Sequence, residues 1–171
     1  MVKLVGSAVF LAGVAGTLLS WNFKEQALIR RIQTWIDFMN ATEYAMEIDH
    51  VNMTIYMEHA KINEPVLMQT IRETGSLLRE QMVPFGEEAW DIVCEKYRKE
   101  WDTSEEVWLL ILSCKHVFFG KNLAENMEKS KEIRKRLTGL LEEEKRRFAE
   151  QKKIYIPVGM LGSCMFLLIF L

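Results

Sequence analysis

Residues 152–171 read KKIYIPVGMLGSCMFLLIFL, and this stretch decides how the rest of the chain is interpreted. After Lys152 and Lys153, no charged side chain occurs in the eighteen residues 154–171. An α-helix needs about 17–25 mostly apolar residues to cross the hydrocarbon core of a bilayer. A helix also pairs its backbone polar groups within the segment, which lipid requires. The stretch therefore predicts a transmembrane helix over 154–171.

A second uncharged run lies near the other end, where residues 4–23 read LVGSAVFLAGVAGTLLSWNF. A cleaved signal peptide is the alternative, because Lys3 precedes the run and small residues occur around Ala15. Against it, the apolar run continues past Ala15 to Phe23, so that cleavage would leave an apolar stub. We therefore expect a second transmembrane helix over 4–23.

The basic residues that flank these two runs predict the orientation. Most lie on the inner side of each run, towards the middle of the sequence: Lys24, Arg30, Arg31, Lys145, Arg146, Arg147, Lys152 and Lys153. Outside the runs there is only Lys3. Because basic residues favour the cytoplasmic side, the middle of the chain is expected in the cytoplasm and both termini outside. The predicted localisation is a two-pass protein of the cell membrane.

The middle of the chain shows helical periodicity and no alternating strand pattern. Residues 24–120 are expected to form a cytoplasmic helical bundle, and 121–153 a long charged helix or stalk that packs on it. Helix starts are predicted at Asn63-Glu64-Pro65, at Glu87, at a capping box over 103–106 in which Thr103 is the cap, and at Asn122. The helix after that capping box is expected to run to Gly120. The predicted fold is all-α, with about five to six bundle helices between two transmembrane helices.

Charge is divided unevenly between these segments. Residues 24–120 carry ten basic and seventeen acidic side chains, whereas residues 121–153 carry eleven basic and seven acidic ones. Basic residues beside a membrane suit anionic headgroups, so membrane lipids are expected partners. The acidic bundle suits a basic protein partner, although a solvated surface is the commoner meaning of such a surplus. Four acidic residues are the candidates for contact with that partner: Glu87, Glu88, Glu105 and Glu106.

The sequence gives little sign of catalytic chemistry. Glu47-x-x-His50 has the spacing of carboxylate di-iron bundles, but such a site needs a second copy, which the chain lacks. The three cysteines, Cys94, Cys114 and Cys164, show no C-x-x-C spacing and are expected to be reduced thiols. We expect no enzyme activity, no metal, no cofactor and no nucleic-acid partner.

Small residues recur at four-residue spacing in both apolar runs. They are Ala8, Ala12, Gly16 and Ser20 in the first run, and Gly159 and Ser163 in the second. Small residues let helix backbones approach closely in lipid, where no hydrophobic drive brings helices together. These positions are predicted to be helix-packing faces, meeting each other within one chain, a second copy, or other membrane subunits.

The order of several short motifs over nearly the whole chain resembles the stage III sporulation protein AB family of endospore-forming bacteria. The motifs are MVKLVG (1–6), EIDH (47–50), EEAW (87–90), the charged segment 142–153, and Tyr155-x-x-Val158-Gly159-x-Leu161-Gly162. Three places depart from the family pattern: His50, where Tyr is common; Met53-Thr54-Ile55, where Thr-Pro-Leu is usual; and the loop Phe118-Phe119-Gly120-Lys121-Asn122.

The resemblance implies a role that composition does not. Members of the family are similar to the platform proteins of type II secretion and type IV pilus machines, and they belong to a channel-like assembly between mother cell and forespore. It implies a scaffold on the mother-cell side of the outer forespore membrane that binds the cytoplasmic ATPase and other membrane subunits of the assembly. The alternative is a generic membrane-tethered helical adaptor that recruits a cytosolic factor in another process. The sequence leaves the oligomeric state and the ATPase-binding surface open.

Overall fold

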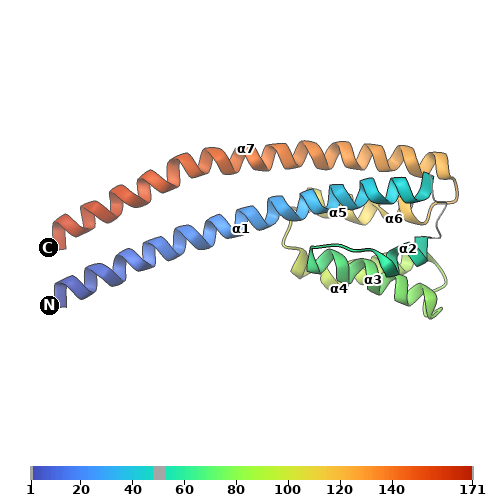
Figure 1. Ribbon diagram of the computed structural model, residues 1–171, viewed down its shortest axis with the longest axis horizontal. Coiled ribbons are helices and arrows are strands. Elements are labelled where there is room, and N and C mark those ends of the chain that lie inside the picture. Colours follow the sequence, from blue (N-terminus) through green and yellow to red (C-terminus); the bar gives the residue numbers. More distant parts are fainter. Residues whose placement is uncertain (1, 48–52, 171) are drawn as a thin grey trace. The chain divides into compact units, whose positions relative to one another are not determined.

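The computed structural model describes residues 2–47 and 53–170, and these residues are helical apart from short connections (Figure 1). The side chains of residues 2–5, 7, 8, 167, 169 and 170 lie outside this description. The helices are α1 (Val2–Glu47), α2 (Met53–His59), α3 (Pro65–Arg79), α4 (Gly86–Trp101), α5 (Glu105–Ser113), α6 (Lys115–Phe118) and α7 (Leu123–Phe170). No strand occurs among the described residues, and the predicted all-α class is confirmed.

The chain divides into two compact units, which are described separately. Unit 1 comprises residues 1–29 and 142–171, and unit 2 comprises residues 30–141. The two long helices, α1 and α7, each contribute to both units. Neither ends near residue 23 or residue 153, and α7 continues through Pro157.

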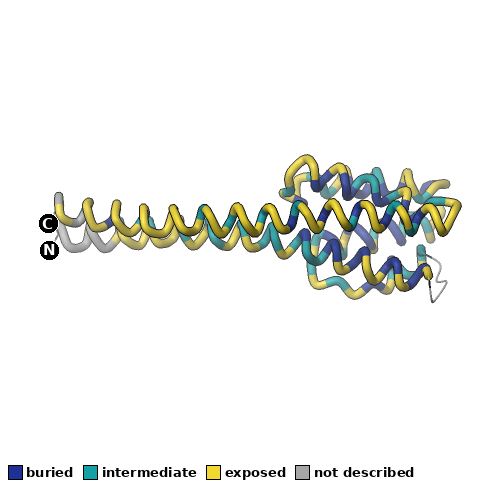
Figure 2. Tube along the Cα trace, turned by 90° about the horizontal axis from the view of Figure 1, so that it is seen from above, coloured by how far each residue is buried: buried dark blue, intermediate teal, exposed yellow. Residues whose placement is uncertain are grey.

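An aromatic cluster forms the centre of unit 2. The ring of Trp35 in α1 lies 6.1 Å from Trp90 of α4 and 5.8 Å from Trp101 at the end of the same helix. All three side chains are buried, and the Trp90 Nε1 donates a hydrogen bond of 3.1 Å to the carbonyl of Ile111 in α5. Figure 2 shows the buried residues gathered in this part of the chain. Burial of such large apolar surfaces is the main stabilising term of the bundle.

The start of α3 confirms one predicted helix signal and connects three helices. Glu64 is the N-cap, with its Oε2 accepting from the Leu67 N–H at 2.6 Å, and Pro65 takes the first helical position. The Glu64 carboxylate also pairs with Arg31 of α1 at 3.3 Å. Arg31 in turn donates a hydrogen bond to the carbonyl of Trp101, the last residue of α4. This partly buried arginine therefore joins α1 to the ends of α3 and α4.

The expected capping box before α5 is shifted by one residue. Ser104, not Thr103, is the N-cap, and its Oγ accepts from the Val107 N–H at 3.4 Å. The Oγ of Thr103 is buried and has no hydrogen-bond partner among the described residues. Both residues can cap a helix, so the sequence alone could not distinguish them.

The helix expected to run from residue 105 to Gly120 is interrupted at Cys114, which separates α5 from α6. The Cys114 N–H bonds to the Ile111 carbonyl at 3.2 Å, a tighter turn than that of an α-helix. The side chains of Ser113 and Cys114 both donate to the Leu110 carbonyl, at 2.7 and 3.2 Å. The tighter turn at Cys114 separates the two helices.

The start of α7 is as expected. Asn122 accepts from the Ala124 N–H through its side chain at 3.1 Å, and from the Asn126 N–H through its carbonyl at 2.9 Å. In unit 2, α7 buries Ile133, Leu137 and Leu141. Its apolar stripe thus packs on the bundle along this part of the helix.

In unit 1, α1 and α7 contact each other through aromatic rings. Phe10 stacks on Phe166 at 3.9 Å, while Trp21 lies 5.1 Å from Tyr155 and 5.5 Å from Phe148. Among the described residues, no helix combines the length and apolarity that crossing a membrane requires.

Candidate partner-binding surface

The four predicted acidic residues lie in the first turns of two helices. Glu87 and Glu88 open α4, and Glu105 and Glu106 open α5. All four are exposed. Carboxylates at this end of a helix interact favourably with the unpaired N–H groups and the helix dipole. Part of their role is therefore to stabilise the helices that carry them.

Two of these four carboxylates are paired inside the bundle. Two ion pairs cross from α4 to the neighbouring α5 and α6, Asp91–Lys115 at 2.6 Å and Arg98–Glu105 at 2.7 Å. The Glu87 carboxylate also contacts Nδ1 of His116 at 3.1 Å, which is an ion pair only when the imidazole is protonated. The Arg98 guanidinium also lies 4.6 Å from the centre of the Trp108 ring. Glu87 and Glu105 thus contribute to helix packing, which reduces the charge they can offer to a partner.

The other two carboxylates, Glu88 and Glu106, make no ion pair with any described residue. Three more acidic side chains between Gly86 and Ser113 are likewise exposed and unpaired: Glu95, Glu100 and Asp102. Between Gly86 and Ser113, these five carboxylates are unpaired, whereas Lys99 is the one basic residue without an acidic partner among the described residues. We call these five residues the free acidic set; its charge is uncompensated within the described bundle.

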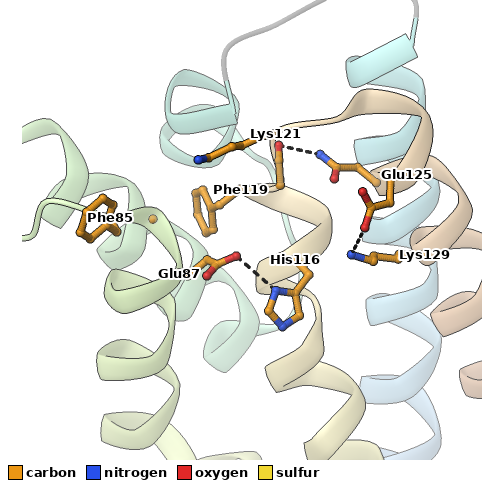
Figure 3. Close-up of a pocket in the computed structure, with 10 residues that line it drawn as sticks. Phe85, Glu87, His116, Phe119, Lys121, Glu125 and Lys129 are labelled. Atoms are coloured by element: carbon orange, nitrogen blue, oxygen red, sulfur yellow. Dashed lines mark hydrogen bonds and ion pairs between the residues drawn. The ribbon is translucent and has the colours of Figure 1, made fainter.

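A cavity of about 400 Å³ opens beside the N-terminus of α4, and sequence reasoning did not find it (Figure 3). Phe85 and Phe119 supply its aromatic walls, and Lys121 lies at its edge. Gly86 is required here, because a Cβ at this position would lie 2.7 Å from Cε1 of Phe119 and closer still to other ring atoms. Gly120 also lines the cavity, and a Cβ there would meet Asn126, so two isolated glycines mark this place in the sequence.

A second cavity, of about 250 Å³, adjoins the first, since His116 and Lys129 line both. Leu110 of α5 and Ile133 of α7 contribute its apolar lining. Two ion pairs lie along α7 at the edge of these cavities: Lys129 pairs with Glu125 at 2.6 Å, and Arg136 pairs with Glu132 at 2.7 Å. We call the two cavities together the α6 groove. An apolar lining with charged edges is suited to binding a protein segment.

Of the Glu47-x-x-His50 spacing, which was not expected to bind metal, His50 lies outside the described residues. Its partner Glu47 is exposed at the end of α1. Within the described ranges, no group of three or more His, Cys, Asp or Glu side chains is arranged to hold a metal ion. Cys94 and Cys114 are buried thiols, and burial raises the pKa of each well above its ordinary value.

The two predicted small-residue faces lie differently in unit 1. Gly159 and Ser163 of α7 face α1, where a Cβ on Gly159 would lie 2.9 Å from the Leu18 side chain. Ser163 is buried, and its Oγ donates to the Gly159 carbonyl at 2.7 Å. On α1, Ala12, Gly16 and Ser20 are exposed, and the side chain of Ala8 lies outside the description. Gly159 of the α7 face thus packs against Leu18, whereas the predicted α1 positions Ala12, Gly16 and Ser20 are exposed.

The comparisons with known proteins identify a family. The family model for stage III sporulation protein AB matches residues 3–171, nearly the whole chain. No curated protein and no solved structure matches the sequence. Because the family match covers far more than half of the chain, the resemblance inferred from the short motifs is confirmed. The chain belongs to the stage III sporulation protein AB family, which implies a role in stage III of sporulation.

Proposed function

We propose that this protein is a membrane-anchored, non-catalytic platform subunit of a secretion-like assembly in endospore formation. The observation that carries the proposal is the family match over residues 3–171. In this account unit 2 lies in the cytoplasm of the mother cell, at the outer forespore membrane, and acts by binding other components. No cofactor takes part.

The membrane part of the proposal is supported by the uncharged runs 4–23 and 154–171. The aromatic contact of Trp21 with Tyr155 and Phe148 lies at the inner ends of these runs. Aromatic rings of this kind favour the headgroup level of a bilayer. The neighbouring Lys152 and Lys153 are exposed, as expected for contact with anionic lipid headgroups.

The proposed soluble partner is the cytoplasmic ATPase of the same assembly. The free acidic set supports this choice of surface, because its five carboxylates have no internal counter-charge and would attract a basic region of a partner. The α6 groove adds apolar contact area at the edge of the same bundle. Charge would then steer association, while burial in the groove would slow dissociation.

Other membrane subunits, or a second copy of this chain, are the proposed partners of the α1 small-residue face. Ala12, Gly16 and Ser20 are exposed in unit 1, so they are available for close contact with another helix.

A charge-reversal experiment tests the ATPase proposal. Glu88→Lys with Glu106→Lys removes two unpaired carboxylates without breaking any ion pair of the described bundle. We expect the full-length double variant to lose at least about tenfold in affinity for the purified ATPase at low salt, with a smaller loss at high salt. Glu128→Lys is the matched control, since Glu128 is also exposed and unpaired but lies on α7.

Equal binding of the wild type, the double variant and the control would refute the acidic surface as the contact. Absence of ATPase binding by the wild type itself would refute the platform role. If the protein acts in another process as a general adaptor, deletion of its gene would leave spore formation intact.

A further inference from the structure

In unit 1, one arginine is shared by two carboxylates from different helices. Arg147 Nη2 lies 2.6 Å from Glu144 Oε2, one turn earlier in α7, and 3.5 Å from Glu25 Oε2 in α1. The side chains of Glu144 and Glu25 are only 17% and 20% exposed. The cluster therefore joins α1 to α7.

The cluster holds more negative charge than its arginine can neutralise. Glu144 Oε2, though close to the guanidinium, makes no well-aligned hydrogen bond to any described residue. The charged groups that act on Glu144 are Arg147 and Glu143 from α7 and Glu25 from α1. Two carboxylates thus share one cation in a place where water is partly excluded, with the exposed Glu143 adding further negative charge nearby, and such a site favours the binding of a proton.

The electrostatics of Glu144 agree with this geometry. Burial, the largest effect, raises the pKa of Glu144 above its ordinary value of 4.5; Arg147 opposes the rise, and Glu25 and Glu143 add to it. A carboxyl whose pKa is higher in the packed pair than in solution binds its proton more tightly when the helices are in contact. Proton binding by Glu144 therefore stabilises the contact between α1 and α7. This stabilisation is fully present below about pH 4.5 and is lost as the pH rises through the raised pKa of Glu144.

We propose that Glu25, Glu144 and Arg147 form a proton-dependent clamp between α1 and α7. When Glu144 takes up a proton from solvent, its carboxyl becomes neutral and Arg147 is free to pair fully with Glu25 across the two helices. When Glu144 loses that proton, the two carboxylates compete for Arg147 and repel each other, and the contact between the helices loosens. The inference does not depend on the ATPase proposal, since both helices belong to the same chain.

Distance measurements on the full-length protein in detergent micelles test the clamp. Spin labels on cysteines introduced at the exposed positions Gln26 and Ala149, in a Cys164→Ala background, report the separation of α1 and α7; Cys94 and Cys114 are buried. We expect the distance distribution to narrow and shift to shorter values as the pH falls from about 8 to about 4.5, following a one-proton titration.

Three substitutions distinguish the clamp from a general effect of acid. Glu144→Gln should give the narrow, acid-type distribution at every pH. Glu25→Gln should move the midpoint to lower pH, because the competing carboxylate is gone. Glu150→Gln is the control and should behave as the wild type, since Glu150 is exposed and has no ion pair among the described residues.

A wild-type distribution that does not change with pH would overturn the proposal, as would a Glu144→Gln variant that keeps the wild-type pH dependence. If that variant loses helical structure, titration of the Glu144 carboxyl carbon by NMR in the wild type decides instead. A midpoint above 4.5 supports the clamp, whereas one at or below 4.5 contradicts it.

Discussion

Replacing Gly86 by alanine should destabilise unit 2, although alanine is intrinsically the better helix former. Gly86 is the first residue of α4, and the Phe119 ring packs directly over its backbone. A Cβ would approach three atoms of this ring, with the Cε1 contact at 2.7 Å. Since ordinary carbon contacts lie at about 3.5–4.0 Å and the other two ring atoms lie closer than Cε1, the ring has to move by more than about 1 Å.

The size of the effect follows from two opposing terms. Forcing an extra methyl group into a packed site costs about 1–3 kcal/mol, whereas alanine gains at most about 1 kcal/mol over glycine in a helix. We therefore expect a net loss of about 1–2 kcal/mol in the free energy of unfolding. With a urea dependence of about 1–3 kcal/mol per molar, the midpoint should fall by roughly 0.3–2 M.

Gly139→Ala is the matched control. Gly139 lies inside α7 and is exposed, and a Cβ there has no atom within 4 Å. This substitution should raise the free energy of unfolding by about 0.5–1 kcal/mol. Urea unfolding of the full-length variants in detergent, followed by tryptophan fluorescence, measures both changes, because Trp35, Trp90 and Trp101 are buried in unit 2. A Gly86→Ala variant as stable as Gly139→Ala would refute the packing of Phe119 on α4.

Two further predictions concern the same bundle. Arg31→Ala should lower the free energy of unfolding by about 2–4 kcal/mol in urea titrations. The substitution leaves the partly buried Glu64 carboxylate without its cation and removes the hydrogen bond to the end of α4. A loss below about 0.5 kcal/mol would show that the contact is unimportant. Cys94 and Cys114 should react with a thiol reagent at about pH 8 only after unfolding, because burial raises the pKa of both thiols. Rapid reaction in the folded protein would contradict their burial.

The helix starts show what the sequence could predict. The signals at Asn63-Glu64-Pro65 and Asn122 are local, because a cap and its N–H partner lie within three residues of each other, and the structure places helices there. The break at Cys114 was missed, because the residues on both sides of it continue an otherwise regular helical pattern.

The candidate surface was predicted only in part, because pairing across helices is not visible in a single sequence. Glu87 and Glu88 are adjacent and chemically alike, yet Glu87 pairs with His116 of α6 while Glu88 has no such partner among the described residues. Nor did the sequence indicate that Gly86 lies under Phe119, a residue more than thirty positions away. The α6 groove results from these long-range contacts.

The proposed membrane-anchored topology is tested most directly by labelling a cysteine in the intact cell. Lys99→Cys, in a Cys164→Ala background, places one exposed thiol in unit 2, while Cys94 and Cys114 are buried. The account predicts that a membrane-impermeant maleimide leaves this thiol unlabelled in intact sporulating cells and labels it after the membrane is permeabilised. Equal labelling before and after permeabilisation would contradict a cytoplasmic platform held by two membrane helices.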